Sequence, residues 1–351
     1  MTHFETSLCL IGQASSNDKD TNNPSIKSKP HSFHRTSLQR FFFPLLYFFK
    51  LIKNKPNIII MCTHELLFAS LVYKLFFRAK LIYDIQEDYF KNCYYSNAYS
   101  KPLGLFLAYY VRLKEKTCAR WISHFLLAEK IYKKDLNFIK NKYTTIENKS
   151  LYNPNLDNPS LRYTTNNNHS RKKVKLIITG TLSKKFGVFN ALFFIEAYRK
   201  HVPNACLYIV GFAPLASEQE EIKEYIKTKP YIHAIGIDTI VPHEEIITLV
   251  SKSDLVLMPY ALDKDTLGRI PTKLYEYLSL QKPMLIQKNK DWQKITDIYN
   301  AAVYIDFNDF DIQGILGELT NTCFYTKEVS DDIYWQSEEK KLIKALRPYY
   351  S

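Results

Sequence analysis

The sequence predicts an α/β protein made of two Rossmann-like domains, each a parallel sheet with helices between consecutive strands. Apolar, strand-like runs alternate with helix-like segments over residues 57–85 and again over residues 174–287. Residues 152–172 separate the two series and are rich in proline and asparagine, which is typical of a linker. A chain of 351 residues with 46% apolar residues is long enough for two domains with cores of their own.

The first domain is expected over residues 1–151. Short runs rich in isoleucine and leucine predict strands, and apolar residues spaced three and four apart predict helices. The expected elements are a strand at 4–12 that ends in Gly12, a loop at 13–36, a helix at 38–53, a strand at 57–61, a helix at 65–77, a strand at 80–85, a helix at 104–120, a strand at 125–127 and a helix at 129–140.

The second domain is expected over residues 173–328, followed by a charged C-terminal helix within 329–351. Glycine and proline punctuate this part and mark the ends of its elements. The expected strands are 174–179, 206–210, 232–235, 255–258 and 284–287, and the expected helices are 187–201, 216–228, 243–252, 271–280 and about 332–348. In such sheets ligands bind at the carboxyl ends of the strands, so the loops there are the candidate site.

Charge is concentrated in the first half of the chain. Residues 1–150 carry 23 lysine and arginine residues against 11 aspartate and glutamate residues, whereas the rest carries 25 against 24. A basic half attracts phosphate-rich partners such as nucleic acid, anionic lipid or a lipid diphosphate, although a merely solvated basic surface is also compatible with it. No nucleic-acid-reading motif accompanies the charge, so nucleic acid is not expected.

Several classes of protein are excluded by pattern. No apolar run approaches the roughly 18 residues of a membrane-spanning helix. The aromatic run Phe41–Phe49 either contacts a membrane interface or packs against the first sheet, and packing is the preferred interpretation. Six cysteines without CxxC spacing indicate a reducing compartment and no zinc site, and there is no Walker A motif.

The segment from Arg269 to Glu276 holds the most informative residues. Pro271 suits the start of a helix, whose first N–H groups and positive dipole end favour a phosphate. Lys273 adds charge at that end, beside Thr272, and Glu276 lies three residues on along the same face, free to accept a hydrogen bond from a sugar hydroxyl. The sequence therefore predicts a nucleotide-sugar pocket here, against the alternative of a solvated helix.

A second candidate turn of the second domain lies at the same edge of the sheet. Gly180, Thr181, Lys184 and Lys185 follow a strand in the stretch that ends at Gly187, and their backbone N–H groups and lysines favour a diphosphate. An ordinary strand–helix turn is the alternative.

Farther along the chain, backbone groups near Gly236 are candidates to hold a base. His243 is interpreted as the first residue of a helix rather than as a catalyst.

Carboxylates of the first domain follow the strand 80–85 directly. Glu87 and Asp88 are candidates to contact an acceptor or to support a positively charged sugar, and a solvated loop is the alternative. His64 follows the strand 57–61 and is a candidate base, while an exposed position beside a capping Thr63 is an equal alternative. No metal-binding cluster is legible.

Taken in order, five short segments resemble the GT-B glycosyltransferases, most closely glycosyltransferase family 4 of bacterial surface-polysaccharide synthesis. The resemblance covers residues 55–348. It rests on the segments Leu81–Tyr89, Ile178–Ser183, Leu207–Gly211, Ser253–Tyr260 and Ile270–Leu278.

The resemblance implies two domains that face each other across a cleft, a UDP- or GDP-sugar donor on the second domain, and an acceptor on the first. It also implies retention of anomeric configuration, no required metal or cofactor, and a tail helix that crosses back to the first domain. Glu276 matches the ribose-binding glutamate, and the turn after Gly180 with residues 269–273 matches the diphosphate site. Lys185, Arg269 and Lys273 would then stabilise the leaving nucleotide diphosphate.

Three positions depart from the family pattern. Gly268 and Thr181 stand where a glutamate and an arginine are common, and Gln86 stands where a histidine is common, so Glu87 or Asp88 would have to replace that histidine. In addition, the first strand of the first domain and its glycine-rich loop are not found ahead of residues 4–12, which resemble the second strand.

The leading hypothesis is a cytoplasmic enzyme, peripheral on the inner face of the cytoplasmic membrane, that moves a sugar to a lipid-linked or polysaccharide acceptor. An anionic membrane surface is an expected partner of the basic first domain. Because of the departures, a catalytically silent nucleotide-sugar-binding partner of a glycan-assembly complex remains open. A nucleotide-sugar epimerase of the same fold remains open too.

Overall fold

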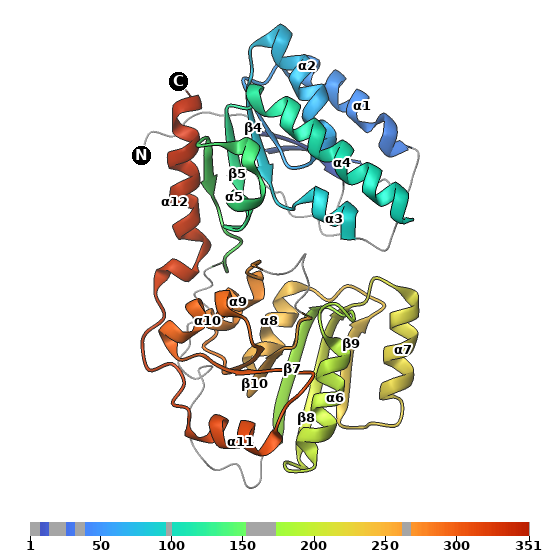
Figure 1. Cartoon of the computed structure of the whole chain (residues 1–351), viewed down its shortest axis with the longest axis vertical. Helices are drawn as coiled ribbons and strands as arrows, with labels where there is room; N and C mark the ends of the chain where they lie inside the picture. Colours follow the sequence, from blue (N-terminus) through green and yellow to red (C-terminus); the bar gives the residue numbers. More distant parts are fainter. Residues whose placement is uncertain are drawn as a thin grey trace. The chain divides into compact units, whose positions relative to one another are not determined.

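The structure is a computed structural model that describes residues 8–13, 26–31, 39–95, 100–151, 173–261 and 268–350 (Figure 1). The predicted linker 152–172 lies outside the described residues. The chain divides into two compact units. Unit 1 comprises Met1–Ala128, Tyr132–Thr144 and Leu346–Ser351, and unit 2 comprises Glu129–Ile131 and Thr145–Ala345. The domain boundaries expected from the sequence stay predictions.

The core of unit 1 is a four-stranded sheet in the order β3-β4-β5-β6. The first three strands are parallel neighbours in chain order. They run over Ile58–Met61 (β3), Lys80–Ile85 (β4) and His124–Leu127 (β5), with β6 at Tyr143–Thr145. Because both faces of β4 are covered, its side chains from Leu81 to Tyr83 are all buried, as expected for a strand inside a parallel sheet.

Three long helices cover one face of this sheet. They are α1 (Gln39–Asn54), α2 (Leu67–Phe77) and α4 (Lys101–Cys118). Right-handed crossovers from β3 to β4 and from β4 to β5 place α2 and α4 on the same face. Helix α2 contacts both α1 and α4, so the three form one layer (Figure 1).

Two predictions for unit 1 are wrong. The predicted loop 13–36 contains strand β2 (Ile26–His31), which pairs in parallel with β1 (Leu8–Gln13) in a separate two-stranded sheet. The helix predicted at 129–140 is only the short α5 (Tyr132–Asp135) and a 3-10 turn at Asn137–Ile139, because the backbone leaves the helical region at Leu136, where φ is −109° and ψ is 70°. Helix α3 (Tyr89–Tyr95) was not predicted.

In the described residues β3 is an edge strand of this sheet, and β1, expected to be the second strand of the first domain, pairs with β2 in the separate sheet instead. Ile60 of β3 is therefore 45% exposed although it belongs to an apolar strand. A parallel sheet of this kind normally buries both faces of its strands.

Unit 2 contains a six-stranded parallel sheet in the order β12-β11-β10-β7-β8-β9. The strands are β7 (Val174–Thr181), β8 (Ala205–Phe212), β9 (Ile232–Ile237), β10 (Leu255–Met258), β11 (Met284–Gln287) and β12 (Ala302–Ile305). The chain builds outward from β7 to β9, then returns to the other side of β7 with β10. This reversal is the topological switch point, where open α/β sheets bind ligands.

Alternate residues of the strands feed two cores. Leu176 and Ile178 join one apolar cluster, whereas Ile177 between them joins the other. The helices that cover the sheet are α6 (Val188–Arg199), α7 (Ala216–Ile226), α8 (His243–Ser251), α9 (Thr272–Ser279), α10 (Lys290–Thr296) and α11 (Ile312–Asn321). Elements α10, β12 and α11 were not predicted.

The C-terminal helix α12 (Trp335–Leu346) is fixed to unit 2 by buried charge. Glu338 is fully buried, and one of its carboxylate oxygens lies 2.7 Å from Nζ of Lys149. The other accepts the backbone N–H of Glu147 at 3.2 Å. Glu147 in turn accepts a hydrogen bond from the hydroxyl of Tyr275 on α9. The residues after α12 belong to unit 1, where Tyr349 donates to the carbonyl of Ser123.

None of the helices in the described part of the chain has the length and hydropathy that a bilayer crossing requires. The same described residues contain no cluster of histidine, cysteine, aspartate and glutamate suited to a metal ion.

Candidate functional site

The candidate site of unit 2 lies at the carboxyl ends of β7 and β10, on either side of the switch point. Strand β7 runs through Gly180 to Thr181 and into the turn that follows, and β10 runs into the loop that leads to α9. Both loops come from the sequence segments predicted to bind a nucleotide sugar. Topology thus brings together two segments about 90 residues apart in the chain.

Three glycines form a row across this edge of the sheet. Gly180, Gly211 and Gly236 are in register on β7, β8 and β9. The strands approach so closely here that a Cβ atom on Gly211 would lie 1.8 Å from the carbonyl oxygen of Gly180. A row without side chains lets a ligand approach the backbone at this edge closely, as phosphates do at glycine-rich turns.

Lys273 reaches across from α9 to the first of these glycines. Its ammonium donates to the carbonyl oxygen of Thr179, and a Cβ atom on Gly180 would collide with it at 2.1 Å. Gly180 also has a φ of +95°, which a side chain rarely adopts. The predicted phosphate-binding turn and the predicted phosphate-binding lysine are therefore in direct contact.

The start of α9 is open to a ligand. Its N-cap is Pro271, and no side chain caps the first turn. The N–H groups of Thr272 and Lys273 thus stand at the positive end of the helix dipole. The preceding loop is fixed from both sides, because the indole of Trp292 donates to the carbonyl of Arg269 and the N–H of Ile270 donates to the carboxylate of Glu129.

Glu276 lies one turn along α9 and pairs with a histidine. Its carboxylate is 2.8 Å from Nε2 of His243, the first residue of α8. The hydrogen bond to Glu276 is the largest cause of a pKa for His243 above its ordinary value of 6.5, and partial burial opposes it. The interpretation of His243 as a helix-start residue describes its backbone, but the contact with Glu276 was not predicted.

The remaining predicted residues of unit 2 are spread around the turn. Thr181 ends β7 with an exposed side chain. Lys184 forms an ion pair of 2.7 Å with Glu221 on α7. Both side chains are exposed, so screening by solvent makes this pair weak. The carbonyl of Lys185 accepts the N–H of Ala261, so this lysine ties the turn to the loop after β10.

The candidates in unit 1 have separate environments. Asp88 is almost fully buried, pairs with Arg112 at 2.6 Å and caps the start of α3 through the N–H of Phe90. This arrangement favours a structural role for Asp88. Glu87 is exposed and accepts a hydrogen bond from Asn92 at 2.5 Å, and the His64 ring packs edge-on against Tyr89.

Two residues near the site were not predicted from the sequence. The sequence identifies Gly211 only as the last residue of the segment Leu207–Gly211, although its spacing after β7 could have revealed the glycine row. Glu129 was assigned to a helix. Burial, which is the main cause, raises its pKa to about 7, while the N–H of Ile270 and the charge of Arg269 act in the opposite direction. No local pattern could have identified its partner Ile270, which lies 141 residues away in the chain.

Together these groups can bind a diphosphate and a ribose. The glycine row and the open turn of α9 offer backbone donors, Lys273 offers charge, and Glu276 offers an acceptor for hydroxyl groups. Donors fixed in advance around a developing negative charge are the usual means of stabilising a leaving group.

Comparison with known proteins gives similarity in structure alone. No protein-family model and no curated protein matches the sequence. HepE of Anabaena, solved with UDP and glucose, is 14% identical with a TM-score of 0.61, and the match covers 92% of this chain and 86% of that one. Sucrose-phosphate synthase of Thermosynechococcus elongatus is 11% identical with a TM-score of 0.66, covering 96% and 87%.

A third solved structure agrees with these two. A glycosyltransferase of Rickettsia africae is 13% identical with a TM-score of 0.54, and the match covers 92% of this chain and 85% of that one. These neighbours are GT-B glycosyltransferases. With its two parallel sheets of four and six strands, the chain has the α/β GT-B fold.

Proposed function

We propose that the chain is a glycosyltransferase that uses a nucleotide-sugar donor held by unit 2. The observation that carries the proposal is the contact between Lys273 and Gly180 at the switch point, beside the uncapped start of α9. A diphosphate at this place would meet backbone N–H groups and a lysine, and the ribose would meet Glu276. HepE is solved with UDP and with UDP-glucose, which supports a donor of this kind.

The donor would be a UDP- or GDP-sugar, and transfer would proceed with retention of anomeric configuration and without a metal or cofactor. As the glycosidic bond to the diphosphate breaks, Lys273, Arg269 and Lys185 would offset the negative charge that develops on the leaving group. Loss of one such donor typically raises a barrier by about 2.7–4 kcal/mol. Glu87 and His64 remain the acceptor-side candidates of unit 1.

The finer assignments follow the same resemblance. Membership of glycosyltransferase family 4, a lipid-linked or polysaccharide acceptor and a role in the bacterial cell envelope are part of the proposal. So is a cytoplasmic location, peripheral on the inner face of the membrane, to which the basic unit 1 would be drawn.

Calorimetry with UDP and GDP tests the donor site. We expect the wild type to bind one of the two nucleotides, and Glu276→Ala to weaken it by about tenfold or more through the lost ribose contact. The matched control is Glu318→Ala, an exposed glutamate on α11. Absence of binding by the wild type, or equal losses in both variants, would refute the donor site. Sugar release from the donor then separates a transferase from a binding protein.

A second candidate is a catalytically silent nucleotide-sugar-binding partner in a glycan-assembly complex. One observation favours it. Gly268, at a position where the family often has a glutamate, has a φ of +81°, and a Cβ atom there would lie 3.1 Å from the Ile131 side chain. The loop is thus shaped for glycine, and a glutamate could not simply be restored. Nucleotide binding without hydrolysis or transfer, with every acceptor tried, would select this candidate.

A further inference from the structure

The outer faces of α1, α2 and α4 in unit 1 are apolar and exposed. On α1, the large side chains directed away from the sheet are Phe42, Leu45, Leu46, Phe49 and Ile52. The opposite side of the helix packs inward through Tyr47, whose hydroxyl lies 2.9 Å from that of Ser70 on α2. Packing of α1 on the rest of unit 1 therefore uses one side only, and the preferred sequence interpretation explains only half of the aromatic run.

Helices α2 and α4 continue the same face. On α2, Phe68 is 65% exposed and Phe76 is 74% exposed. On α4, the buried stripe through Gly104, Ala108 and Val111 lies opposite a row of exposed apolar side chains. Soluble monomers rarely expose contiguous apolar patches larger than a few hundred Å², and larger patches mark an interaction site.

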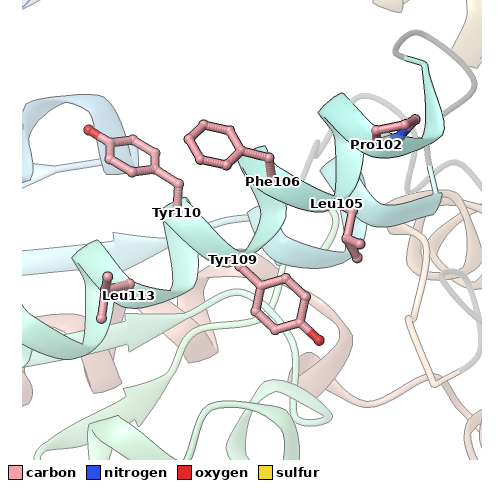
Figure 2. A pocket seen from close by; sticks show the side chains of 6 residues that line it. All are labelled: Pro102, Leu105, Phe106, Tyr109, Tyr110 and Leu113. Carbon is pink, nitrogen blue, oxygen red and sulfur yellow. The ribbon is translucent and has the colours of Figure 1, made fainter.

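The outward face of α4 also carries a shallow apolar hollow. Figure 2 shows its six side chains projecting from successive turns of the helix, namely Pro102, Leu105, Phe106, Tyr109, Tyr110 and Leu113. The rings of Phe106 and Tyr110 are stacked at 6.4 Å, and the ammonium of Lys114 lies 5.3 Å from the centre of the Tyr110 ring. Tyrosine beside lysine, both with an apolar body and a polar tip, suits a membrane–water interface.

The charge of these three helices selects one class of partner. Their sequences contain eight lysine and arginine residues and a single carboxylate, Glu115. Glu115 is buried and pairs with Arg112 and the hydroxyl of Tyr83, so it does not weaken the positive field outside. An apolar face edged by lysines, with no exposed carboxylate on its own helices, is complementary to anionic lipid.

We propose that the α1–α2–α4 face of unit 1 docks on the surface of an anionic bilayer, with its aromatic and aliphatic side chains at the interface. A second copy of the chain fits less well, because pairing the two faces would bring the exposed lysines of one copy against those of the other. The inference rests on the peripheral location proposed above and names the face of unit 1 that would meet the membrane. It needs no nucleotide.

Vesicle co-sedimentation of the full chain tests the proposal. We compare vesicles of phosphatidylcholine alone with vesicles of phosphatidylcholine and phosphatidylglycerol. We expect binding to the anionic vesicles that falls as salt is raised, and a loss of about tenfold or more in Phe106→Asp. The control Ile343→Asp changes a residue on α12 that is 60% exposed, and it should bind as the wild type does.

The charge contribution is tested separately with the exposed residues Lys53 and Lys116. At roughly fivefold per lysine near an anionic surface, the double change Lys53→Gln/Lys116→Gln should weaken binding by about 25-fold. The control Lys227→Gln/Lys252→Gln removes the same charge from exposed positions of unit 2 and should have little effect.

Four outcomes would overturn the docking surface. They are no vesicle binding by the wild type, binding that ignores lipid charge, a dimer that Phe106→Asp converts to a monomer, and a large fall in melting temperature of Phe106→Asp. The third would assign the face to a second copy, and the fourth would show that another segment of the chain covers it. None of these outcomes depends on nucleotide binding, so failure here and failure of the donor site are distinguishable.

Discussion

The two units of this protein offer different kinds of surface to a binding partner. In unit 2 the notable feature is the absence of side chains, where Gly180, Gly211 and Gly236 lie side by side at the carboxyl edge. In unit 1 the notable feature is the opposite, a large number of exposed apolar side chains, because the helices over the sheet direct phenylalanine and leucine outward. Bare backbone at a strand edge suits a small anionic ligand, whereas a broad apolar helix layer suits an extended surface.

The comparison teaches that the proposed site follows from topology in one unit and from composition in the other. The glycine row indicates a ligand site only because β7 and β10 flank the switch point, where open α/β sheets bind ligands. The apolar layer indicates a docking surface because α1, α2 and α4 are neighbours and carry basic residues at the edges of the layer. Each half of this contrast can be broken separately.

The largest effect is expected at the centre of the glycine row. In Gly211→Ala the added Cβ would lie 1.8 Å from the carbonyl oxygen of Gly180, so β7 and β8 must separate. We expect a loss of more than about 4 kcal/mol in the free energy of unfolding, measured by urea titration, because backbone cannot move aside as a side chain can.

The matched control for that change is Gly317→Ala on α11. A Cβ atom at this position meets nothing within 4 Å, and the glycine lies inside a helix. Alanine should therefore stabilise the chain by about 0.5–1 kcal/mol. If Gly211→Ala were as harmless as the control, the close approach of β7 and β8 would be wrong.

A smaller loss is expected from the buried ion pair that holds α12 to unit 2. Removing the charge in Lys149→Met leaves the carboxylate of Glu338 buried with only Lys341 and one N–H beside it. We expect about 3 kcal/mol of destabilisation at neutral pH in the same titration. Lys227→Met, which breaks an exposed pair with Glu224, should change stability by less than about 0.5 kcal/mol.

The same pair predicts a pH dependence. Burial alone would raise the pKa of Glu338, but hydrogen bonds from Lys149 and Lys341 outweigh burial, so its pKa is lowered. A lowered carboxyl pKa gives stability that is present above the unfolded pKa, and it is lost as pH falls through the folded value. The stability of the wild type should therefore fall more steeply in acid than that of Lys149→Met, and parallel curves would contradict this.

The smallest effect concerns the pairing of His243 with Glu276. Because the pKa of His243 is raised, the charged pair is complete below pH 6.5 and is lost as pH rises through the raised value. A nucleotide that needs Glu276 should thus bind better at higher pH, by about fivefold at most since His243 is largely exposed.

Calorimetry across pH 6 to 8.5 with His243→Gln as the reference isolates this effect, because titration of the ligand phosphate is common to both proteins. A wild type whose UDP affinity follows the variant at every pH would show that the histidine does not compete for Glu276.

Most of the sheet strands could be predicted because each is a short apolar run closed by glycine, proline or a charge. Strands β4, β10 and β11 begin and end where the sequence predicted. Strand β2 could not be predicted, since Ile26–His31 reads Ile-Lys-Ser-Lys-Pro-His and has no strand pattern. The short helix α5 and the 3-10 turn after it were predicted as one long helix, because Tyr132, Leu136 and Ile139 have helical spacing.

The candidate site was predictable where it is local in sequence. Residues 269–276 and 180–187 carry their signals within one turn, and the structure brings Lys273 to Gly180. The contacts of Glu129 with Ile270 and of His243 with Glu276 join residues that are distant in the chain, so no spacing rule reveals them. The sequence suggested a free carboxylate at Glu276, whereas the structure pairs it with His243.

Hydrogen exchange with and without UDP or GDP tests the central claim most directly. The account predicts slower exchange on nucleotide binding in peptides that cover residues 179–187 and 270–276, with α1, α2 and α4 unchanged. Protection confined to unit 1, or no protection at either segment by a nucleotide that binds, would contradict a donor site at the switch point of unit 2.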